Sequence, residues 1–180
     1  MYTFIAVLWP DLNTIPCVPN PSSRDILVSF VEQYCSTNDT NISRELGFGT
    51  QGIVFKSGHN TAIKVYNLQD GYRREKSVYK RLEERKVHSV QEMSIPRIVG
   101  WDDELLTFEM SIVHVPCVID FGGAYLDTPP DHMTRDAIWE TQKSEEFGEN
   151  WERAKSVIRE IEHRVDIWLA DINTGNIKFE

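Results

Sequence analysis

The segment LGFGTQGIVFKSGHNTAIKVY, residues 46–66, decides the fold of this chain. Its glycines follow the spacing G-x-G-x-x-G at Gly47, Gly49 and Gly52, and Lys64 lies among apolar residues further along. Because β-branched and aromatic residues follow the glycines, the segment predicts strand, glycine turn, strand, short loop and strand. Without Cβ atoms, such a turn can approach a phosphate chain closely, and its N–H groups can form an anion-binding concavity. Lys64 can contact the same phosphates as a point charge.

The glycine spacing alone is compatible with two other structures. In a dinucleotide-binding βαβ unit the glycines open a helix, but the residues after Gly52 favour a strand. A β-hairpin could also use glycines only to turn. That alternative would leave the spacing from the glycines to Val54 and to Ala62-Ile63-Lys64 to chance.

The string G-x-G-x-x-G-x-V followed by Ala-Ile-Lys resembles the protein kinase-like family. In that family a glycine-rich loop covers ATP and a lysine on the third strand pairs with the phosphates. The resemblance therefore assigns ATP binding to Gly47, Gly49, Gly52 and Lys64. It also implies a glutamate that holds this lysine from a following helix.

A helix predicted over residues 72–87 supplies that glutamate. Glu75, Val78 and Leu82 share one face at helical spacing, so Glu75 is expected on the buried side. An unpaired buried carboxylate is unfavourable, and Lys64 is the obvious partner. The many basic residues of this helix predict a solvated face rather than a nucleic-acid surface, because no exposed aromatics are interleaved with them.

Residues 95–110 predict two further strands joined by a turn at 102–104. The resemblance implies a gatekeeper residue behind the adenine and a hinge at 109–111 that offers backbone groups to the adenine edge. An apolar slot would hold the base. The implied adenine contacts are Val54, Ala62, Phe108, Glu109 and Met110.

Asp171 and Asn176 carry the second motif, D-x-x-x-x-N, near the end of the sequence. Helices predicted over 134–147 and 150–163 and a strand over 165–169 lead to it. The motif resembles the kinase catalytic loop, in which the Asp accepts the hydrogen bond of the substrate hydroxyl and the Asn holds Mg²⁺. The usual His-Arg pair before the Asp is replaced by Leu-Ala.

The resemblance departs from the family pattern after Asn176. The metal-binding Asp-Phe-Gly tripeptide should follow the catalytic loop, but only four residues follow Asn176. Asp120-Phe121-Gly122 spells the tripeptide ahead of the loop, and this order favours a chance match. Two alternatives stay open: Asp171 holds the metal itself, or Asp120 or Asp127 reaches the mouth of the cleft from the segment that leaves the hinge.

Composition limits the partners and the compartment. The chain has 180 residues and a formal net charge of -9, which disfavours nucleic acid and anionic membrane as general partners. Three scattered cysteines predict neither a disulfide framework nor a metal site, so a reducing cytoplasm fits best. The apolar start lacks a basic region and is interrupted by Pro10, which argues against a signal peptide or membrane span.

The sequence thus predicts an α+β, protein kinase-like chain. Residues 1–41 would form an N-terminal extension with a packing helix, 42–112 a β-rich small lobe and 113–180 a reduced, mainly helical large lobe. The expected function is a minimal ATP-dependent phosphotransferase that uses Mg²⁺, acting on a protein or a small molecule. The alternative is a pseudokinase, with or without bound nucleotide, that serves as an interaction or regulatory module.

Overall fold

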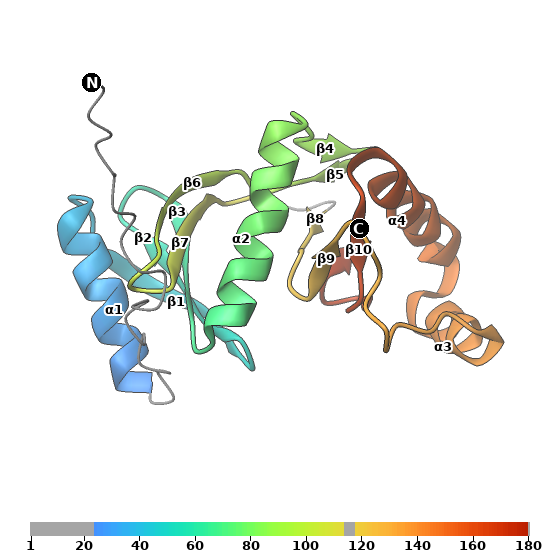
Figure 1. The fold of residues 1–180 in the computed structure, drawn as a ribbon, viewed down its shortest axis with the longest axis horizontal. Coiled ribbons are helices and arrows are strands. Elements are labelled where there is room, and N and C mark those ends of the chain that lie inside the picture. The colour runs from blue at the N-terminus through green and yellow to red at the C-terminus, as the bar shows by residue number, and fades with distance from the viewer. Residues whose placement is uncertain (1–23, 114–117, 180) are drawn as a thin grey trace, which may run out of the picture.

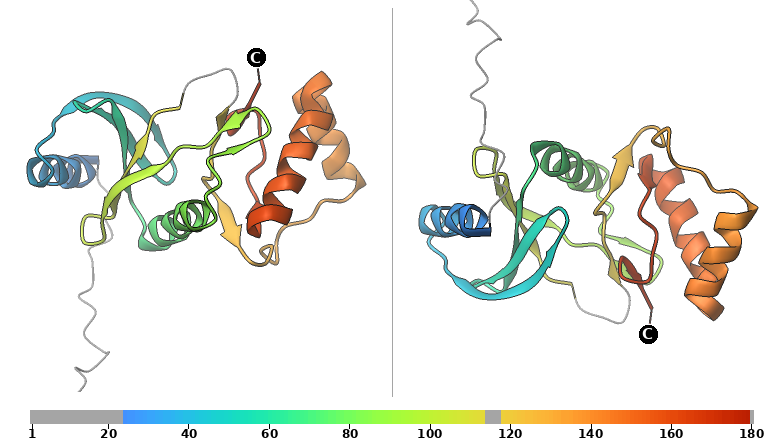
Figure 2. Two further views of the ribbon diagram at one scale, coloured as in Figure 1. Left: turned by 90° about the horizontal axis from the view of Figure 1, so that it is seen from above. Right: turned by 90° about the horizontal axis from the view of Figure 1, so that it is seen from below.

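The computed structural model describes residues 24–113 and 118–179 and has an α+β architecture (Figure 1). A five-stranded antiparallel sheet has the order β1-β2-β3-β7-β6. Helices α1 (Arg24–Thr37) and α2 (Gln69–Glu84) lie on opposite sides of this sheet (Figures 1 and 2). Beyond α2 lie the remaining short strands with helices α3 and α4. The predictions made for residues 1–23 concern a segment that lies outside the described residues.

The quoted segment forms the strands that its sequence predicts. β1 (Ile42–Gly49) and β2 (Gly52–Ser57) are joined by a two-residue turn, and β3 (Thr61–Tyr66) follows a short loop. The sheet continues with β7 (Thr107–Ser111) and has β6 (Ile98–Asp102) at its edge. Val54 pairs with Lys64, which pairs with Phe108, so the three side chains lie on one face of the sheet.

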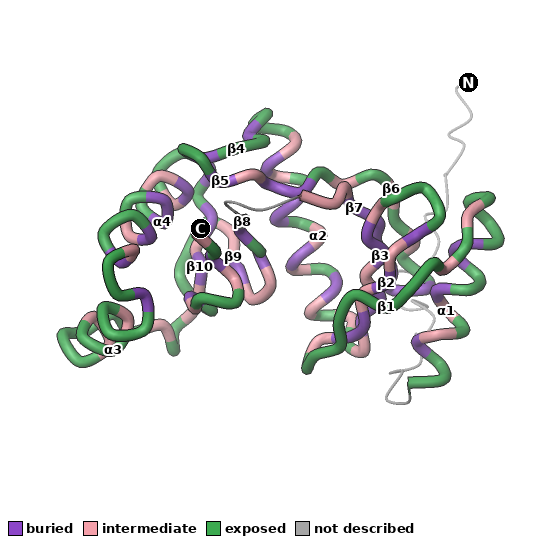
Figure 3. Tube along the Cα trace, turned by 180° about the vertical axis from the view of Figure 1, so that it is seen from behind, coloured by how far each residue is buried: buried purple, intermediate pink, exposed green. Residues whose placement is uncertain are grey.

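Both faces of the central strands β2, β3 and β7 are largely buried, which explains why these strands are so apolar. Ile63 and Val65 point to one face and pack in a cluster with Leu27 and Val31 of α1. The alternate residues of β3, Ala62 and Tyr66, join the larger cluster formed with α2 and the second group of strands. Figure 3 shows these buried stretches on the strands and on parts of α1 and α2.

A buried carboxylate also joins α1 to the sheet. Glu109 of β7 is only 6% exposed, and its side chain accepts hydrogen bonds from the hydroxyls of Tyr34 in α1 and Thr61 in β3. Burial, together with the nearby Glu109 charge, raises the pKa of Tyr34. The packing helix predicted within residues 1–41 is therefore present as α1.

Helix α2 begins and ends three residues earlier than the predicted range 72–87. Gly71 in its first turn does not delay the start. The helix ends because Lys86 adopts a left-handed conformation with φ of 55°, and the Val87 amide then donates to the Leu82 carbonyl.

The second part of the molecule contains two small sheets. One has the order β11-β8-β5-β4, with β4 at Ser89–Val90, β5 at Met93–Ser94, β8 at Val118–Ile119 and β11 at Ile177–Lys178. The other pairs β9 (Ala124–Leu126) with β10 (Ile167–Leu169). In the first sheet β8 lies between β11, from the end of the chain, and β5, which follows α2.

Helices cover one side of this second part, and two predicted boundaries need correction. α3 (Ala137–Phe147) starts later than residue 134, because the Asp136 side chain caps it by accepting from the Trp139 amide. A short 3₁₀ turn at 148–150 leads into α4 (Trp151–Val165). The strand predicted over 165–169 is wrong at its start, since Val165 ends α4 and Asp166 adopts a left-handed φ of 54°. No helix in the described ranges is long and apolar enough to cross a membrane.

Candidate functional site

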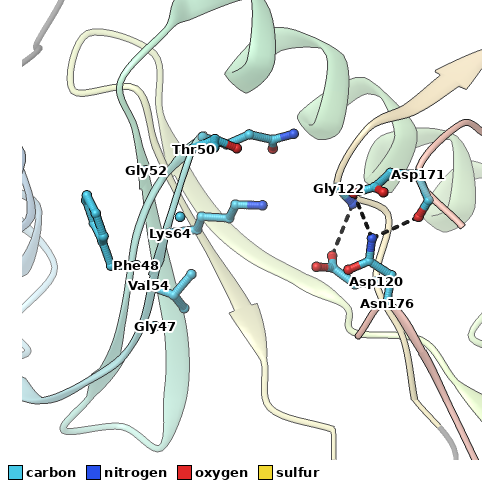
Figure 4. A pocket seen from close by; sticks show the side chains of 12 residues that line it. Gly47, Phe48, Thr50, Gly52, Val54, Lys64, Asp120, Gly122, Asp171 and Asn176 are labelled. Atoms are coloured by element: carbon cyan, nitrogen blue, oxygen red, sulfur yellow. Dashed lines mark hydrogen bonds between the residues drawn. The ribbon is translucent and has the colours of Figure 1, made fainter. Parts of the chain in front are cut away.

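A cavity of about 310 Å³ lies between the glycine hairpin and the second part of the molecule (Figure 4). The hairpin contributes one wall, and the turn after β8 and the loop between β10 and β11 contribute the floor. Lys64 extends from the sheet toward the floor. The lining residues include Gly47, Gly49, Gly52, Val54, Lys64, Asp120, Gly122, Asp171 and Asn176.

Lys64 forms the ion pair with Glu75 that the sequence predicts. Its Nζ lies 2.8 and 2.6 Å from the two carboxylate oxygens of Glu75. β3 fixes the lysine, and α2 presents Glu75 on the face that packs against the sheet, where the residue is 1% exposed. Burial raises the pKa of Glu75, and the charge of Lys64 opposes this rise. A buried carboxylate of this kind holds the lysine in one place above the floor.

The loop after β10 places Asp171 and Asn176 on the floor of the cavity. The Asn176 side-chain amide donates to the Asp171 carbonyl at 2.8 Å and to its carboxylate at 3.0 Å. Asn173 donates to the other carboxylate oxygen at 2.8 Å and accepts from the amides of Gly175 and Asn176. The loop therefore fixes both predicted residues through its own hydrogen bonds.

Asp120 lies on the same floor, although it precedes the loop by fifty residues of sequence. β8 pairs antiparallel with β11, with Ile119 opposite Ile177, and the Asp120 amide donates to the Asn176 carbonyl at 2.8 Å. Strand pairing, rather than chain order, decides which residues share the cavity. The structure therefore places Asp120 in the cavity, although the order of the motifs along the chain favoured a chance match of the tripeptide.

The turn after Asp120 packs directly on the catalytic-loop candidate. Gly122 donates its amide to the Asp120 carboxylate at 3.2 Å. Gly123 has a φ of 80°, and a Cβ added there would lie 3.2 Å from the Cβ of Asp171. Asp127, the other candidate, instead pairs with Arg81 of α2 and is not among the cavity residues.

Aromatic side chains connect this turn to helix α2. Phe121 is fully buried, and its ring centroid lies 5.7 Å from that of Tyr79. The Tyr79 ring lies 5.6 Å from Phe108 of β7. Through these contacts, the helix that carries Glu75 packs on the segment that carries Asp120.

A second, adjoining cavity of about 260 Å³ is the more apolar part of the cleft. Val54, Met110 and Ile119 are among its lining residues, and it shares Lys64 and Asp120 with the first cavity. Of the residues expected to contact adenine, only Val54 and Met110 line either of these two cavities.

The other adenine contacts implied by the resemblance lie elsewhere. Ala62 is 8% exposed and Phe108 is fully buried in the aromatic cluster. The Glu109 carboxylate points to α1, as described above. The segment expected as a hinge continues as strand β7 to Ser111, whose amide donates to the Arg97 carbonyl at 2.8 Å. Sheet pairing on both sides of β7 explains this difference.

The backbone around the hairpin leaves different amounts of space for a side chain at its three glycines. Gly52 has a φ of 150°, and a Cβ added there would lie 1.9 Å from the Val65 carbonyl oxygen. Added Cβ atoms at Gly47 and Gly49 meet nothing within 4 Å. The fold therefore requires glycine only at position 52, and the other two leave the hairpin open.

We expect Gly52→Ala to destabilise the protein strongly, because its Cβ clashes with backbone and its φ disfavours a side chain. Gly47→Ala and Gly49→Ala serve as matched controls and should melt close to the wild type. Thermal unfolding followed by circular dichroism measures the difference. A Gly52→Ala protein as stable as the two controls would contradict this account of the hairpin.

The floor has donors suited to a hard divalent cation. Two carboxylates and one amide, from Asp120, Asp171 and Asn176, line the same cavity, and Mg²⁺ prefers such oxygen ligands. Among the described residues, no group of three or more His, Cys, Asp or Glu side chains could hold a metal. Mg²⁺ commonly binds one or two carboxylates together with substrate phosphates. The donor set therefore fits a cation that arrives with a phosphorylated ligand.

Comparison with family models, curated proteins and solved structures finds no match for this chain. The sequence motifs identified most of the residues that share the cleft. Among the charged residues of the first cavity, the exception is Asp120, whose sequence signal is the tripeptide Asp-Phe-Gly. The tripeptide itself is typical of a metal-binding residue in the cleft, whereas its position before the D-x-x-x-x-N motif argued against that role.

Proposed function

We propose that the chain binds ATP with Mg²⁺ in this cleft and transfers a phosphoryl group to a hydroxyl of a protein or small-molecule substrate. One observation carries the proposal. Lys64, Asp120, Asp171 and Asn176, from three separate segments of the chain, line a single cavity below the glycine hairpin. A scaffold that binds no nucleotide has no physical need for this combination.

Each residue has a role that its position allows. Lys64, held by Glu75, contacts the phosphates, and the hairpin covers them. Asp120 and Asn176 would hold Mg²⁺, which neutralises charge on the transferred group when it is bound. Asp171 accepts the hydrogen bond of the attacking hydroxyl and orients it. The more apolar cavity lined by Val54 and Met110 would take the base.

The arrangement of strands supports this proposal over a pseudokinase that lost its metal ligand. Asp120, which follows β8, offers a carboxylate beside Asn176 that could hold the metal. Antiparallel pairing of β8 with β11 brings Asp120 to Asn176 whichever strand comes first in the chain. The strand order of the larger sheet and the helix carrying Glu75 add to the resemblance noted in the sequence.

Nucleotide titration tests the proposal directly. We expect ATP with Mg²⁺ to raise the melting temperature of the wild-type protein, with about 2.7 kcal/mol of added stability at a hundredfold excess over Kd. ATP without Mg²⁺ should bind more weakly, because the carboxylates of the floor repel free phosphates. Transfer of radiolabelled phosphate to the protein itself or to a generic substrate then measures catalysis. No shift with ATP and Mg²⁺ would reject the proposal, and a shift without transfer would favour the pseudokinase.

A further inference from the structure

A separate cavity of about 430 Å³ lies on the outer side of α2, away from the proposed active site. It is formed by α2 and the turn between β6 and β7. We call it the α2 groove and define it by Tyr72, Arg73, Lys76, Lys80 and Asp103.

The α2 groove is positively charged on an acidic protein. Three of its side chains are cationic and only Asp103 is anionic, whereas the whole chain carries a formal charge of -9. Within the described part of the chain, no ion pair joins Arg73 or Lys80 to a carboxylate. By contrast, Arg81 of the same helix is paired with Asp127. The groove therefore offers cations that the fold itself does not neutralise.

Asp103 shows how the groove holds an anionic group. Its carboxylate accepts a hydrogen bond from the Tyr72 hydroxyl at 2.6 Å and pairs with the Lys76 ammonium. Tyr72 and the Lys76 side chain are only 1% and 12% exposed, whereas Arg73 and Lys80 are exposed, so an anion from solvent can reach these last two cations.

An aromatic side chain lies beside these cations. The Lys76 and Lys80 ammonium groups lie 4.9 and 5.6 Å from the ring centroid of Trp101. Trp101 is 47% exposed, and Val99 on the same edge strand is 58% exposed. Apolar surface beside unneutralised cations suits a segment that combines acidic and apolar side chains.

We propose that the α2 groove docks an acidic, extended segment of a partner protein, with its carboxylates on Arg73 and Lys80 and an apolar side chain against Trp101. A nucleic acid fits less well, because the positive surface is short: Arg81 is paired with Asp127, and Arg85 lies 3.9 Å from Asp166.

Docking at this place would also favour nucleotide binding, a consequence that rests on the proposed function. Lys76 follows Glu75 directly in α2, so a ligand that holds this part of the helix favours the position in which Glu75 pairs with Lys64. By linkage, ATP would then strengthen binding of the segment by the same factor.

The test measures binding of a fluorescein-labelled peptide to the full chain by fluorescence anisotropy, in the absence of nucleotide. The peptide has about twelve residues, with glutamates on both sides of a central pair of phenylalanines. We expect binding that weakens with salt, and a loss of about tenfold or more in affinity for the double variant Arg73→Glu and Lys80→Glu. The control, Arg44→Glu with Arg159→Glu, makes the same change in net charge on other surfaces and should bind like the wild type. Circular dichroism confirms that both variants are folded.

The proposal is overturned if the two double variants bind the peptide with equal affinity. It is also overturned if the wild-type protein binds an oligouridine RNA of similar length more tightly than it binds the peptide. A glutamine version of the peptide should not bind, and if it binds equally well the charge argument fails. ATP affinity is measured on the same proteins in a separate titration. If the wild-type protein does not bind ATP, the proposed function and the linkage are rejected. The docking proposal is still decided by the peptide measurements.

Discussion

Asp120→Ala is expected to abolish Mg²⁺-dependent phosphoryl transfer as completely as Asp171→Ala does. A loss of roughly 10²–10⁴-fold is the usual scale for removing a group that acts in proton transfer, and each tenfold corresponds to about 1.4 kcal/mol. The Asp120→Ala variant would lack an oxygen that binds the metal. The Asp171→Ala variant would lack the acceptor that orients the substrate hydroxyl. Both side chains are exposed on the cavity floor, so we expect both variants to fold.

Two measurements separate these roles. Asp120→Ala should raise the Mg²⁺ concentration needed for half-maximal ATP binding, whereas Asp171→Ala should reduce transfer and leave ATP binding closer to normal. Asp127→Ala is the matched control, because it lies in the same segment but pairs with Arg81 away from the cavity. If the wild type transfers phosphate and Asp120→Ala does so equally well, the Asp-Phe-Gly spelling is a coincidence and Asp120 has no role.

Lys64→Met is expected to have the largest effect on stability, together with a loss of ATP affinity. It leaves the Glu75 carboxylate 1% exposed and without its cation, and breaking a buried pair in this way costs about 3–5 kcal/mol. The double variant Lys64→Met with Glu75→Gln should recover part of this stability, because no buried charge remains. Urea denaturation of the single and double variants measures both steps.

The stability of Lys64→Met should depend on pH in a defined direction. Burial already raises the pKa of Glu75, and removing Lys64 removes the main influence that lowers it. Above the pKa of the unfolded state, the folded protein then binds more protons than the unfolded one, so the free energy of unfolding falls as pH rises. We expect a larger defect at pH 8 than near pH 5.

Removal of an exposed pair provides the control for this experiment. Arg97 is paired with Glu83 at the surface, and Arg97→Met should change stability little at either pH. A Lys64→Met defect as small as that of Arg97→Met would show that the Lys64–Glu75 pair is not buried in solution.

The sequence by itself determined the features that depend on local order. The glycine spacing and the alternation of apolar residues in residues 46–66 set the β1-β2-β3 register, because these strands are joined by short turns. Helical spacing placed Glu75 on the buried face of α2, and the short separation to β3 made Lys64 its partner. The D-x-x-x-x-N motif was also visible in the sequence, and the hydrogen bonds that fix it connect residues only two to five positions apart.

The tertiary structure alone decided the features that depend on distant segments. β8 and β11 are each two residues long, too short for any periodic signal, yet their pairing brings Asp120 to Asn176. The direction of Glu109 depends on α1, whose Tyr34 hydroxyl reaches its carboxylate across the sheet. Trp101 lies beside the α2 lysines because β6 packs next to that helix, so aromatic and basic residues that are separate in the sequence form one surface. In each case the contact joins segments that are far apart in the sequence. No local sequence pattern specifies that these segments meet, because their contact forms only when the sheets and helices pack together.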